Sequence, residues 1–329
     1  MEIRKIQDRD IDGVVRLWNE SCGTEMPYKP FTRESFKEKF LKNPHYQPEG
    51  SFVLYEGGTL VGFANGLYKR EFLPGETHEN TPGYLTFVLV AKDHRGKGYG
   101  SALYKRVEDF FRNSGKKQVQ VIFFNPINLE WIVPGTEDHD HPNAPGVDMD
   151  GPGYKFLQRQ GFVQRTCEVS FHLDLSGYDL PERLMEREKQ LNEKGIFIEY
   201  YDSGKHDGFD ELFDNLKHEY WRKDIKDNLS LEKPHPILIV NHQGRIRGFA
   251  GPIAVQPSGR GWFAGIGVDP GYEGQGIGTV LFSRLMKSFS AKGARFSTLF
   301  TGEENPARRI YERTGFKPVK KWAVMGKEL

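Results

Sequence analysis

The sequence predicts an α/β (α+β) protein that contains two copies of one domain. The chain has 329 residues, which is roughly twice the length of an ordinary domain. One succession of strands, a glycine-rich turn and helices occurs twice along it. Hydrophobic residues make up 37% of the chain and aromatic residues 13%, which is enough for a buried core in each copy.

Each copy contains two apolar strands joined by a turn. In the first copy Phe52–Tyr55 precedes Gly62-Phe63-Ala64, and in the second Ile237–Val240 precedes Gly248-Phe249-Ala250. Turn-forming residues separate the members of each pair, which predicts a hairpin. The later elements also correspond, and we expect strands at Tyr84–Val90 and Trp262–Val268, helices at Ser101–Asn113 and Thr279–Ser290, strands at Gln118–Phe124 and Arg295–Phe300, and final helices that end at Gly161-Phe162 and Gly315-Phe316.

The spacing of these elements predicts the domain boundaries. We place the first domain at residues 1–176 and the second at 196–329, with 177–195 as a polar linker helix that ends at Gly195. The first copy is longer because it carries an insertion at 125–153, which is rich in Pro, Gly, Asp and His. We expect this insertion to be a functional loop, since long loops inside compact domains often have a function.

Charge and cysteine content exclude several classes of protein. Lys and Arg number 46 and Asp and Glu 45, so the net charge of +1 argues against nucleic acid as a partner. Cys22 and Cys167 lie outside any CxxC pattern, so neither a disulfide framework nor a zinc site is expected. No apolar run is long enough to span a membrane and no apolar signal region begins the chain, so we expect a cytoplasmic protein.

The insertion contains a segment in which acidic residues alternate with histidines, Glu137-Asp138-His139-Asp140-His141. No helical His spacing and no distant partner accompany it, so we predict no metal site. Two interpretations stay open: an acidic wall that attracts a cationic amine, and a solvated loop. An acidic wall of this kind would suit a hydroxyl-rich acceptor such as an amino sugar.

Two glycine-rich loops each join a strand to the start of a helix. The first consists of Arg95, Gly96, Lys97, Gly98, Tyr99 and Gly100, and the second of Glu273, Gly274, Gln275, Gly276, Ile277 and Gly278, followed by Thr279. Unpaired N–H groups and the positive end of the helix dipole lie at a helix start, and glycine lets an anion approach closely. Such a loop suits a phosphate or diphosphate. Neither loop has the spacing of a Walker A or a dinucleotide-binding motif.

The pattern Arg/Gln-x-x-Gly-x-Gly/Ala after a strand resembles the acetyl-CoA loop of GNAT-type N-acetyltransferases. Arg95, Gly98 and Gly100 match this pattern, whereas the second loop has Glu273 at its first position. The resemblance covers both copies and implies two tandem GNAT domains, each a mixed, mostly antiparallel sheet flanked by helices. It also implies that acetyl-CoA is the cosubstrate and that the two loops bind it.

The second copy also resembles the family's closing motif, Asn-x-x-Ala…Tyr-x-x-x-Gly-Phe, at residues 305–316. The resemblance implies that Tyr311 protonates the leaving CoA thiolate and that Asn305 contacts the pantetheine or the acceptor. The first copy has Leu157 and Gly151 at the corresponding positions, and leucine cannot donate a proton. We therefore expect the chemistry in the second copy, and a degenerate first copy that binds CoA or shapes the acceptor site.

Acyl transfer to an amine needs a donor for the oxyanion and a route for the amine's proton. We expect the donor among the backbone N–H groups of Ile266, Gly267 and Val268, on the strand before the second loop. Glu303 and Glu304 are candidates for the general base, and a chain of water molecules is the alternative.

Two further groups of residues bear on the site. By resemblance, some early aromatic residues roof the acceptor pocket, although ordinary core packing is the alternative for Trp18, Tyr28, Phe31, Tyr220 and Trp221. Lys97 and Lys105, together with Arg95, are expected to meet CoA phosphates if the first loop is occupied.

These features predict an acetyl-CoA-dependent N-acetyltransferase that acts on the primary amine of a small molecule, namely an amino sugar, amino acid derivative, polyamine or antibiotic. Two alternatives stay open: a non-catalytic acyl-CoA-binding or regulatory protein, and an N-acetyltransferase for proteins. We expect a monomer or homodimer without a nucleic-acid or membrane partner. The sequence does not determine the acceptor, the acyl chain, the general base or the active copy.

Overall fold

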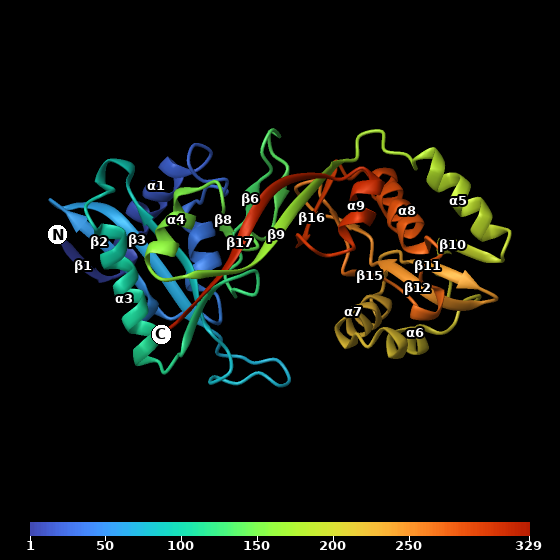
Figure 1. Ribbon diagram of the computed structural model, residues 1–329, viewed down its shortest axis with the longest axis horizontal. Coiled ribbons are helices and arrows are strands. Elements are labelled where there is room, and N and C mark those ends of the chain that lie inside the picture. Colours follow the sequence, from blue (N-terminus) through green and yellow to red (C-terminus); the bar gives the residue numbers. More distant parts are fainter. The chain divides into compact units, whose positions relative to one another are not determined.

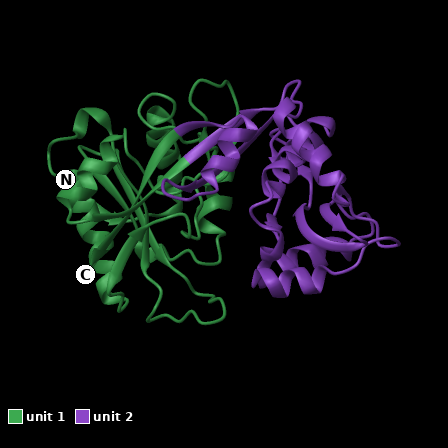
Figure 2. Ribbon diagram, turned by 45° about the vertical axis from the view of Figure 1, so that its right-hand side comes forward, with its two compact units in different colours: residues 1–169, 320–329 green, residues 170–319 purple.

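The computed structural model describes residues 1–329, the whole printed sequence (Figure 1). It divides into two compact units, which are residues 1–169 with 320–329 and residues 170–319 (Figure 2). We call them the first and the second unit. The two divisions fall inside the long strands β9 (Val163–Asp174) and β17 (Lys317–Glu328), and not in the segment 177–195 that the sequence analysis placed between the domains.

The compact units differ from the predicted domains at two places. Helix α5 (Glu182–Asn192) packs against α8 (Ile277–Ala291) and β10 (Ile196–Tyr200), so the predicted linker helix is part of the second unit. Residues 320–329 of the predicted second domain belong to the first unit, because β17 pairs there with β5 (Gln118–Val121).

The first unit is built on a mixed, mostly antiparallel sheet, which confirms the predicted fold class. Its strand order is β1-β2-β3-β4-β5-β17, followed by the first half of β9. All neighbouring pairs from β1 to β4 are antiparallel, β4 and β5 are parallel, and β17 is antiparallel to β5. The strands that have not yet been bounded are β1 (Glu2–Lys5), β2 (Ser51–Glu56), β3 (Thr59–Tyr68) and β4 (Gly83–Val90).

Helices cover both faces of this sheet. On one face α3 (Tyr99–Asn113) buries Leu103, Val107 and Phe111 against the strands, as its helical spacing predicts. On the other face α1 (Ile11–Ser21) buries Trp18 in a separate aromatic core. The remaining short elements are turns of 3-10 helix at Asp8–Asp10, Pro48–Gly50 and Lys92–His94, helix α2 (Arg33–Phe36), a π-helical turn at Lys37–Leu41, and helix α4 (Pro152–Arg159).

The strands β4 and β5 separate soon after they begin. They pair only at Gly83 with Val119 and at Tyr84 with Gln120. A bulge at Thr86 interrupts the pairing of β4 with β3, since Asn65 faces Phe87 and Gly66 faces Leu85. From Leu85 onward β4 therefore has a partner on one side only, and a wedge opens on the other side.

The second unit repeats this plan. Its four-stranded antiparallel sheet has the order β10-β11-β12-β15, and α8 packs on it as α3 does in the first unit. The second half of β9 lies beside β16. The elements of this unit not yet bounded are α6 (Phe209–Leu216), α7 (Glu219–Leu229), β11 (Leu238–His242), β12 (Arg245–Gly251), β13 (Ala254–Val255), β14 (Gly261–Trp262), β15 (Gly265–Val268), a 3-10 turn at Pro270–Tyr272, β16 (Phe296–Gly302) and α9 (Arg308–Thr314).

Three predicted elements differ in detail. The predicted strand 262–268 is broken into β14 and β15, and the predicted strand 118–124 ends at Val121. The insertion 125–153, predicted to be a loop, contains three two-residue strands, β6 (Trp131–Ile132), β7 (Asp140–His141) and β8 (Val147–Asp148). Of these, β8 pairs with β17, so part of the insertion is fixed to the sheet.

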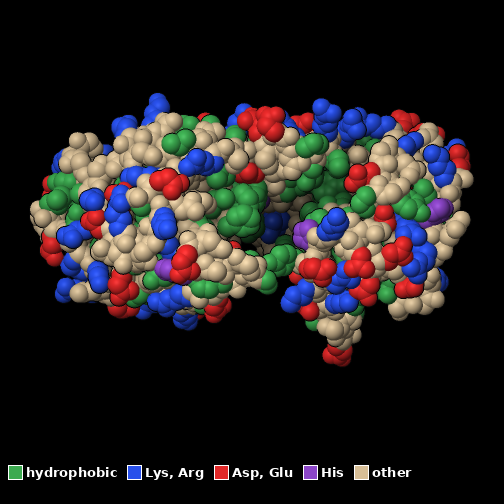
Figure 3. All heavy atoms as spheres, turned by 60° about the horizontal axis from the view of Figure 1, so that its bottom comes forward, with side chains coloured by type: hydrophobic (Ala, Val, Ile, Leu, Met, Phe, Trp, Pro, Cys, Tyr) green, Lys and Arg blue, Asp and Glu red, His purple; other side chains and the backbone are tan.

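The surface carries charges of both signs. Figure 3 shows Lys and Arg side chains mingled with Asp and Glu side chains over the face in view. No helix combines the length and the apolar character that a membrane crossing requires. Neither of the two cysteines, Cys22 and Cys167, forms a disulfide.

Candidate acyl-CoA and acceptor pocket

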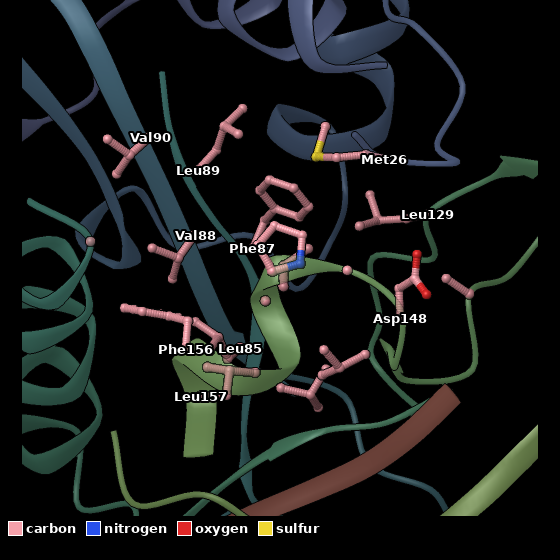
Figure 4. A pocket seen from close by; sticks show the side chains of 18 of the residues that line it. Met26, Leu85, Phe87, Val88, Leu89, Val90, Leu129, Asp148, Phe156 and Leu157 are labelled. Carbon is pink, nitrogen blue, oxygen red and sulfur yellow. The ribbon is translucent and has the colours of Figure 1, made fainter. Parts of the chain in front are cut away.

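A pocket of about 380 Å³ fills the wedge between β4 and β5 in the first unit. One wall is the second half of β4, Leu85 to Val90, and another is α4, through Phe156 and Leu157 (Figure 4). The remaining lining residues come from the first glycine loop, from residues 25–28 and from the insertion 125–153.

The first glycine loop forms one end of this pocket. Gly96 and Gly98 have φ of +78° and +81°, a left-handed conformation that glycine adopts without strain. The backbone N–H groups from Gly96 to Ser101 donate no hydrogen bond within the protein. At the start of a fifteen-residue helix they form a ready site for an anion. The predicted loop residues Arg95, Gly96, Gly98, Tyr99 and Gly100 line the pocket, and Lys97 does not.

The cations predicted to meet phosphates are all engaged elsewhere. Arg95 makes a two-pronged ion pair with Glu25, with N···O distances of 3.2 and 2.7 Å, and its Nε donates to the Val90 carbonyl. Lys97 Nζ lies 3.2 Å from a Glu56 carboxylate oxygen, and Lys105 Nζ lies 2.7 Å from Asp109.

Arg159 is a cation that the sequence analysis missed. It is the last residue of α4, lines the pocket, is exposed and makes no ion pair. The neighbouring residue Gln160 donates to the Ser101 hydroxyl at 2.9 Å, which fixes the end of α4 beside the start of α3. The signal available in the sequence was a basic residue two positions before Gly161-Phe162.

The strand β4 offers a backbone donor inside the wedge. Ala91 N–H bonds to the Val61 carbonyl of β3, so by alternation the N–H groups of Val88 and Val90 point away from β3. Val90 C=O points the same way, because Arg95 Nε bonds it at 3.0 Å. Val88 thus presents a free N–H where the pocket lies. It corresponds to Ile266 in the second copy, where the oxyanion donor was predicted.

The far end of the pocket is polar. Tyr28, Asn125, Asn143 and Asp148 line it, together with apolar residues of the insertion. In Figure 4 the Asp148 carboxylate lies on the side of Leu129 and Met26, away from Phe156. Burial raises the pKa of the Tyr28 phenol, and the charge of Asp148 raises this pKa further.

The predicted roof aromatics divide between pocket and core. Tyr28 lines the pocket, whereas Trp18 and Phe31 pack in the aromatic core beside it, with their ring centroids 5.1 Å apart. The acid–histidine segment of the insertion does not line the pocket. Asp140 bonds to Lys29 at 2.8 Å and His141 stacks on Trp131. No group of three or more His, Cys, Asp or Glu side chains is arranged to hold a metal ion.

The second glycine loop has the same backbone as the first. Gly274 and Gly276 both have φ of +74°, and α8 begins at Ile277. However, Arg187 of α5 lies across it and donates to the Gln275 carbonyl at 2.9 and 2.6 Å. A Cβ atom placed on Gly276 would lie 3.1 Å from Arg187 Nε, whereas one placed on Gly98 would meet nothing within 4 Å.

The strand before the second loop is also covered. A Cβ atom on Gly265 would lie 2.4 Å from the Trp221 indole nitrogen, and one on Gly267 would lie 2.8 Å from Leu216. The predicted roof residue Trp221 therefore packs directly on β15, and Tyr220 is exposed. The predicted donors Ile266, Gly267 and Val268 all belong to this covered strand.

The predicted catalytic residues of the second copy lie on and before α9. Tyr311 packs among Phe171, Phe282 and Phe316, and burial raises its pKa. Asn305 is exposed, and its side chain accepts a hydrogen bond from Ala307 N–H at 2.9 Å. Glu304 is exposed as well, and both Glu303 and Glu304 raise the pKa of Arg308 through their charge.

The pattern of the acetyltransferase (GNAT) family matches this chain twice, at residues 14–129 and 195–316. The chain belongs to that family. Each match covers one glycine loop and the strands leading to it, so the duplicated fold of the two units is the family's fold, repeated in tandem.

The chain is similar to curated and solved members of the family. An acetyltransferase of Yersinia pestis (strain Pestoides F) is 33% identical over 108 residues, which is 33% of this chain and 65% of that protein. The chain spans between 21% and 65% of the length of the curated relatives that it matches.

Two solved structures match over nearly the whole chain. A glucosamine N-acetyltransferase region of a fungal multi-domain β-N-acetylglucosaminidase has a TM-score of 0.67 at 16% identity, over 99% of this chain and 38% of that one. A tandem GNAT protein from the clavulanic acid biosynthesis pathway has a TM-score of 0.55 at 15% identity, over 99% of this chain and 98% of that one. At these identities the likeness shows the fold.

Proposed function

We propose that the first unit is the active site of an N-acetyltransferase, which moves an acetyl group from acetyl-CoA to the primary amine of a small molecule. The observation that carries this proposal is the pocket, which begins at the free N–H groups of the first glycine loop and continues along the open side of β4. Members of this family use an acyl-CoA cosubstrate.

The residues of the first unit fit such a cosubstrate. The N–H groups from Gly96 to Ser101 would bind its diphosphate, with Arg159 as the nearby free cation. The wedge beside β4 would take the pantetheine, since its walls are largely apolar. Val88 N–H would donate to the thioester carbonyl oxygen, which gains negative charge during the reaction.

The reaction needs little further chemistry from the protein. The neutral amine nitrogen, whose ammonium form has given a proton to water, attacks the thioester carbonyl carbon. The carbon–sulfur bond then breaks, the thiolate leaves with the electron pair, and the surplus proton of the nitrogen passes to the thiolate or to water. An alkyl thiol has a pKa of about 8.5, so its thiolate leaves without a dedicated acid. The first unit can therefore be active although it has Leu157 at the position where the family resemblance implies a tyrosine acid. The competing proposal is a reaction in the second unit that depends on Tyr311.

The acceptor class is proposed from the far end of the pocket. Its hydroxyl, amide and carboxylate groups suit a small polar amine. The name of the fungal structure, a glucosamine N-acetyltransferase region, points in the same direction. A purely acyl-CoA-binding protein and a protein N-acetyltransferase are the alternatives; in the first case no amine would be acetylated.

The experiment compares the same substitution in the two loops. Gly98→Ala and Gly276→Ala each place a side chain at positive φ, at a similar cost of about 1 kcal/mol in stability. We expect Gly98→Ala to raise the Kd of acetyl-CoA at least roughly tenfold, because the new methyl group stands between the phosphate and the N–H groups. Gly276→Ala should leave this Kd unchanged in titration calorimetry. The reverse result would move the cosubstrate site to the second unit.

A further inference from the structure

Asp148 is held in an unusual way at the far end of the pocket. Its Oδ1 forms an ion pair with Lys320 Nζ at 2.8 Å and accepts a hydrogen bond from the Asp150 N–H at 3.0 Å. Its Oδ2 accepts no hydrogen bond from the protein. The Asp148 side chain is only 14% exposed, and that of Lys320 only 10%. Oδ2 thus keeps its full capacity to accept a hydrogen bond from a ligand, on a side chain that is mostly shielded from solvent.

Two neighbouring polar groups are also unused. The Tyr28 hydroxyl makes no hydrogen bond with the protein, and Asn143 donates its amide to the Phe123 carbonyl at 3.1 Å while its Oδ1 accepts nothing. Both residues line the pocket. Tyr28 lies close enough to Asp148 for that charge to act on its phenol, and Trp131, whose backbone pairs with Tyr28, donates its indole N–H to the Asn143 carbonyl. The three groups together offer one anionic acceptor, one neutral acceptor and one hydroxyl donor.

Strand pairing holds Asp148 in place without a ligand. Asp148 lies in β8, which pairs with β17 so that Asp148 faces Trp322 and Val147 faces Ala323. Lys320 comes from the same β17 and lies with its Nζ 5.8 Å from the centroid of the Trp322 ring. The ammonium of Lys320 therefore holds Asp148 through Oδ1, and Asp148 lines the pocket with Oδ2 free of any donor from the protein.

We infer that this end of the pocket is a subsite for a protonated amino sugar, in which Asp148 Oδ2 accepts a hydrogen bond from the ammonium group and Tyr28 and Asn143 bind sugar hydroxyls. The inference rests on the proposed function and specifies its acceptor. Lys320 is a positioning residue for Asp148. The subsite selects and orients the amine, and the inference adds no covalent step.

The test uses glucosamine as the probe and glucose as its neutral analogue, with the full-length protein loaded with CoA. Asp148→Asn is compared with Asp150→Asn, because Asp150 is 84% exposed and also lies near Lys320, at 3.5 Å. Ligand-observed NMR titration should show wild type and Asp150→Asn binding glucosamine about tenfold more tightly than glucose. Asp148→Asn should lose this preference and keep its affinity for glucose.

A second pair tests the positioning role. Lys320→Met should reduce the preference for glucosamine, and Lys320→Arg should restore it, since arginine keeps the cation on Oδ1. The Kd of acetyl-CoA, measured by calorimetry, should be the same in all these variants, which also shows that they fold.

Distinct results would overturn the two proposals. If glucosamine does not bind wild type, or if Asp148→Asn keeps the preference, the subsite is refuted while acetyl-CoA binding still supports the transferase. If wild type binds no acetyl-CoA, the proposed function fails, and the subsite fails with it.

Discussion

The basic side chains near the first glycine loop differ in whether a carboxylate already neutralises them. Arg95, Lys97 and Lys105 each have a carboxylate partner, whereas Arg159 has none and lies exposed at the pocket. A paired guanidinium offers little net attraction to a second anion, because its partner must be displaced first. We therefore expect Arg159 to attract a phosphate more strongly than the three paired cations do.

Replacing Arg159 tests this at the scale of one residue. Arg159→Gln should raise the Kd of acetyl-CoA about tenfold, which is the usual weight of one charge-assisted hydrogen bond. Titration calorimetry measures it, and added salt should reduce the difference between variant and wild type. The matched control is Arg165→Gln, an arginine on β9 whose side chain is 55% exposed and which does not line the pocket. Equal effects of both substitutions would contradict a specific role for Arg159.

The residues of the site differ in how far they could be predicted. The spacing of Gly96, Gly98 and Gly100 predicted a loop at a helix start, and the structure places all three at the pocket; their binding of CoA stays a proposal. Asp148 and Arg159 carry no such local sign. The role proposed for Asp148 depends on Lys320, which lies far away in the sequence and occupies its other oxygen.

At the scale of elements, the two copies have the same backbone and different coverings. Both loops begin a fifteen-residue helix with the same glycine conformation. In the second unit α5 brings Arg187 onto the loop, and α6 and α7 bring Leu216 and Trp221 onto β15. The repeat of strands and helices was predictable from hydrophobic periodicity and glycines. Packing of one element over another was not predictable. The sequence analysis favoured the second copy because only that copy has a tyrosine, Tyr311, in the closing motif.

A substitution in helix α9 distinguishes an active first unit from an active second unit. If the first unit is active, Tyr311→Phe should leave kcat unchanged within about twofold, because the Tyr311 ring packs among Phe171, Phe282 and Phe316 and its loss of a hydroxyl disturbs little. Thiol release from acetyl-CoA with glucosamine measures kcat. Leu157→Ala, on the corresponding helix α4 of the first unit, is the companion variant and should lower the turnover. A large loss of kcat in Tyr311→Phe would instead support the acid role implied by the family resemblance.

At the scale of the whole molecule, each long strand serves more than one unit. Residues 320–328 of β17 pair with β5 and with β8 inside the first unit. Trp322 is fully buried there and packs on Trp131 with ring centroids 5.1 Å apart. The predicted boundaries missed this arrangement, since a strand's partner is not visible in its own periodicity.

Trp322→Ala should therefore weaken the first unit although Trp322 follows the second copy in the chain. We expect a loss of about 3–5 kcal/mol. Differential scanning calorimetry measures this loss. Acetyl-CoA should raise the midpoint temperature of one unfolding transition in wild type, and in Trp322→Ala the midpoint of that transition should be lower. Phe249→Ala, which empties a fully buried position of the second unit, should leave that transition in place. An unmoved transition in Trp322→Ala would show that β17 does not support the cosubstrate site.

The path of β17 also sets the order of events during synthesis. Residues 320–329 leave the ribosome after residues 170–319, whose translation takes roughly 8–30 seconds at about 5–20 residues per second. Throughout that interval the nascent first unit has an unpaired edge at β5, which is a surface prone to aggregation. The protein thus completes its proposed catalytic unit last, and a ribosome that stalls before residue 320 would release a chain in need of a chaperone.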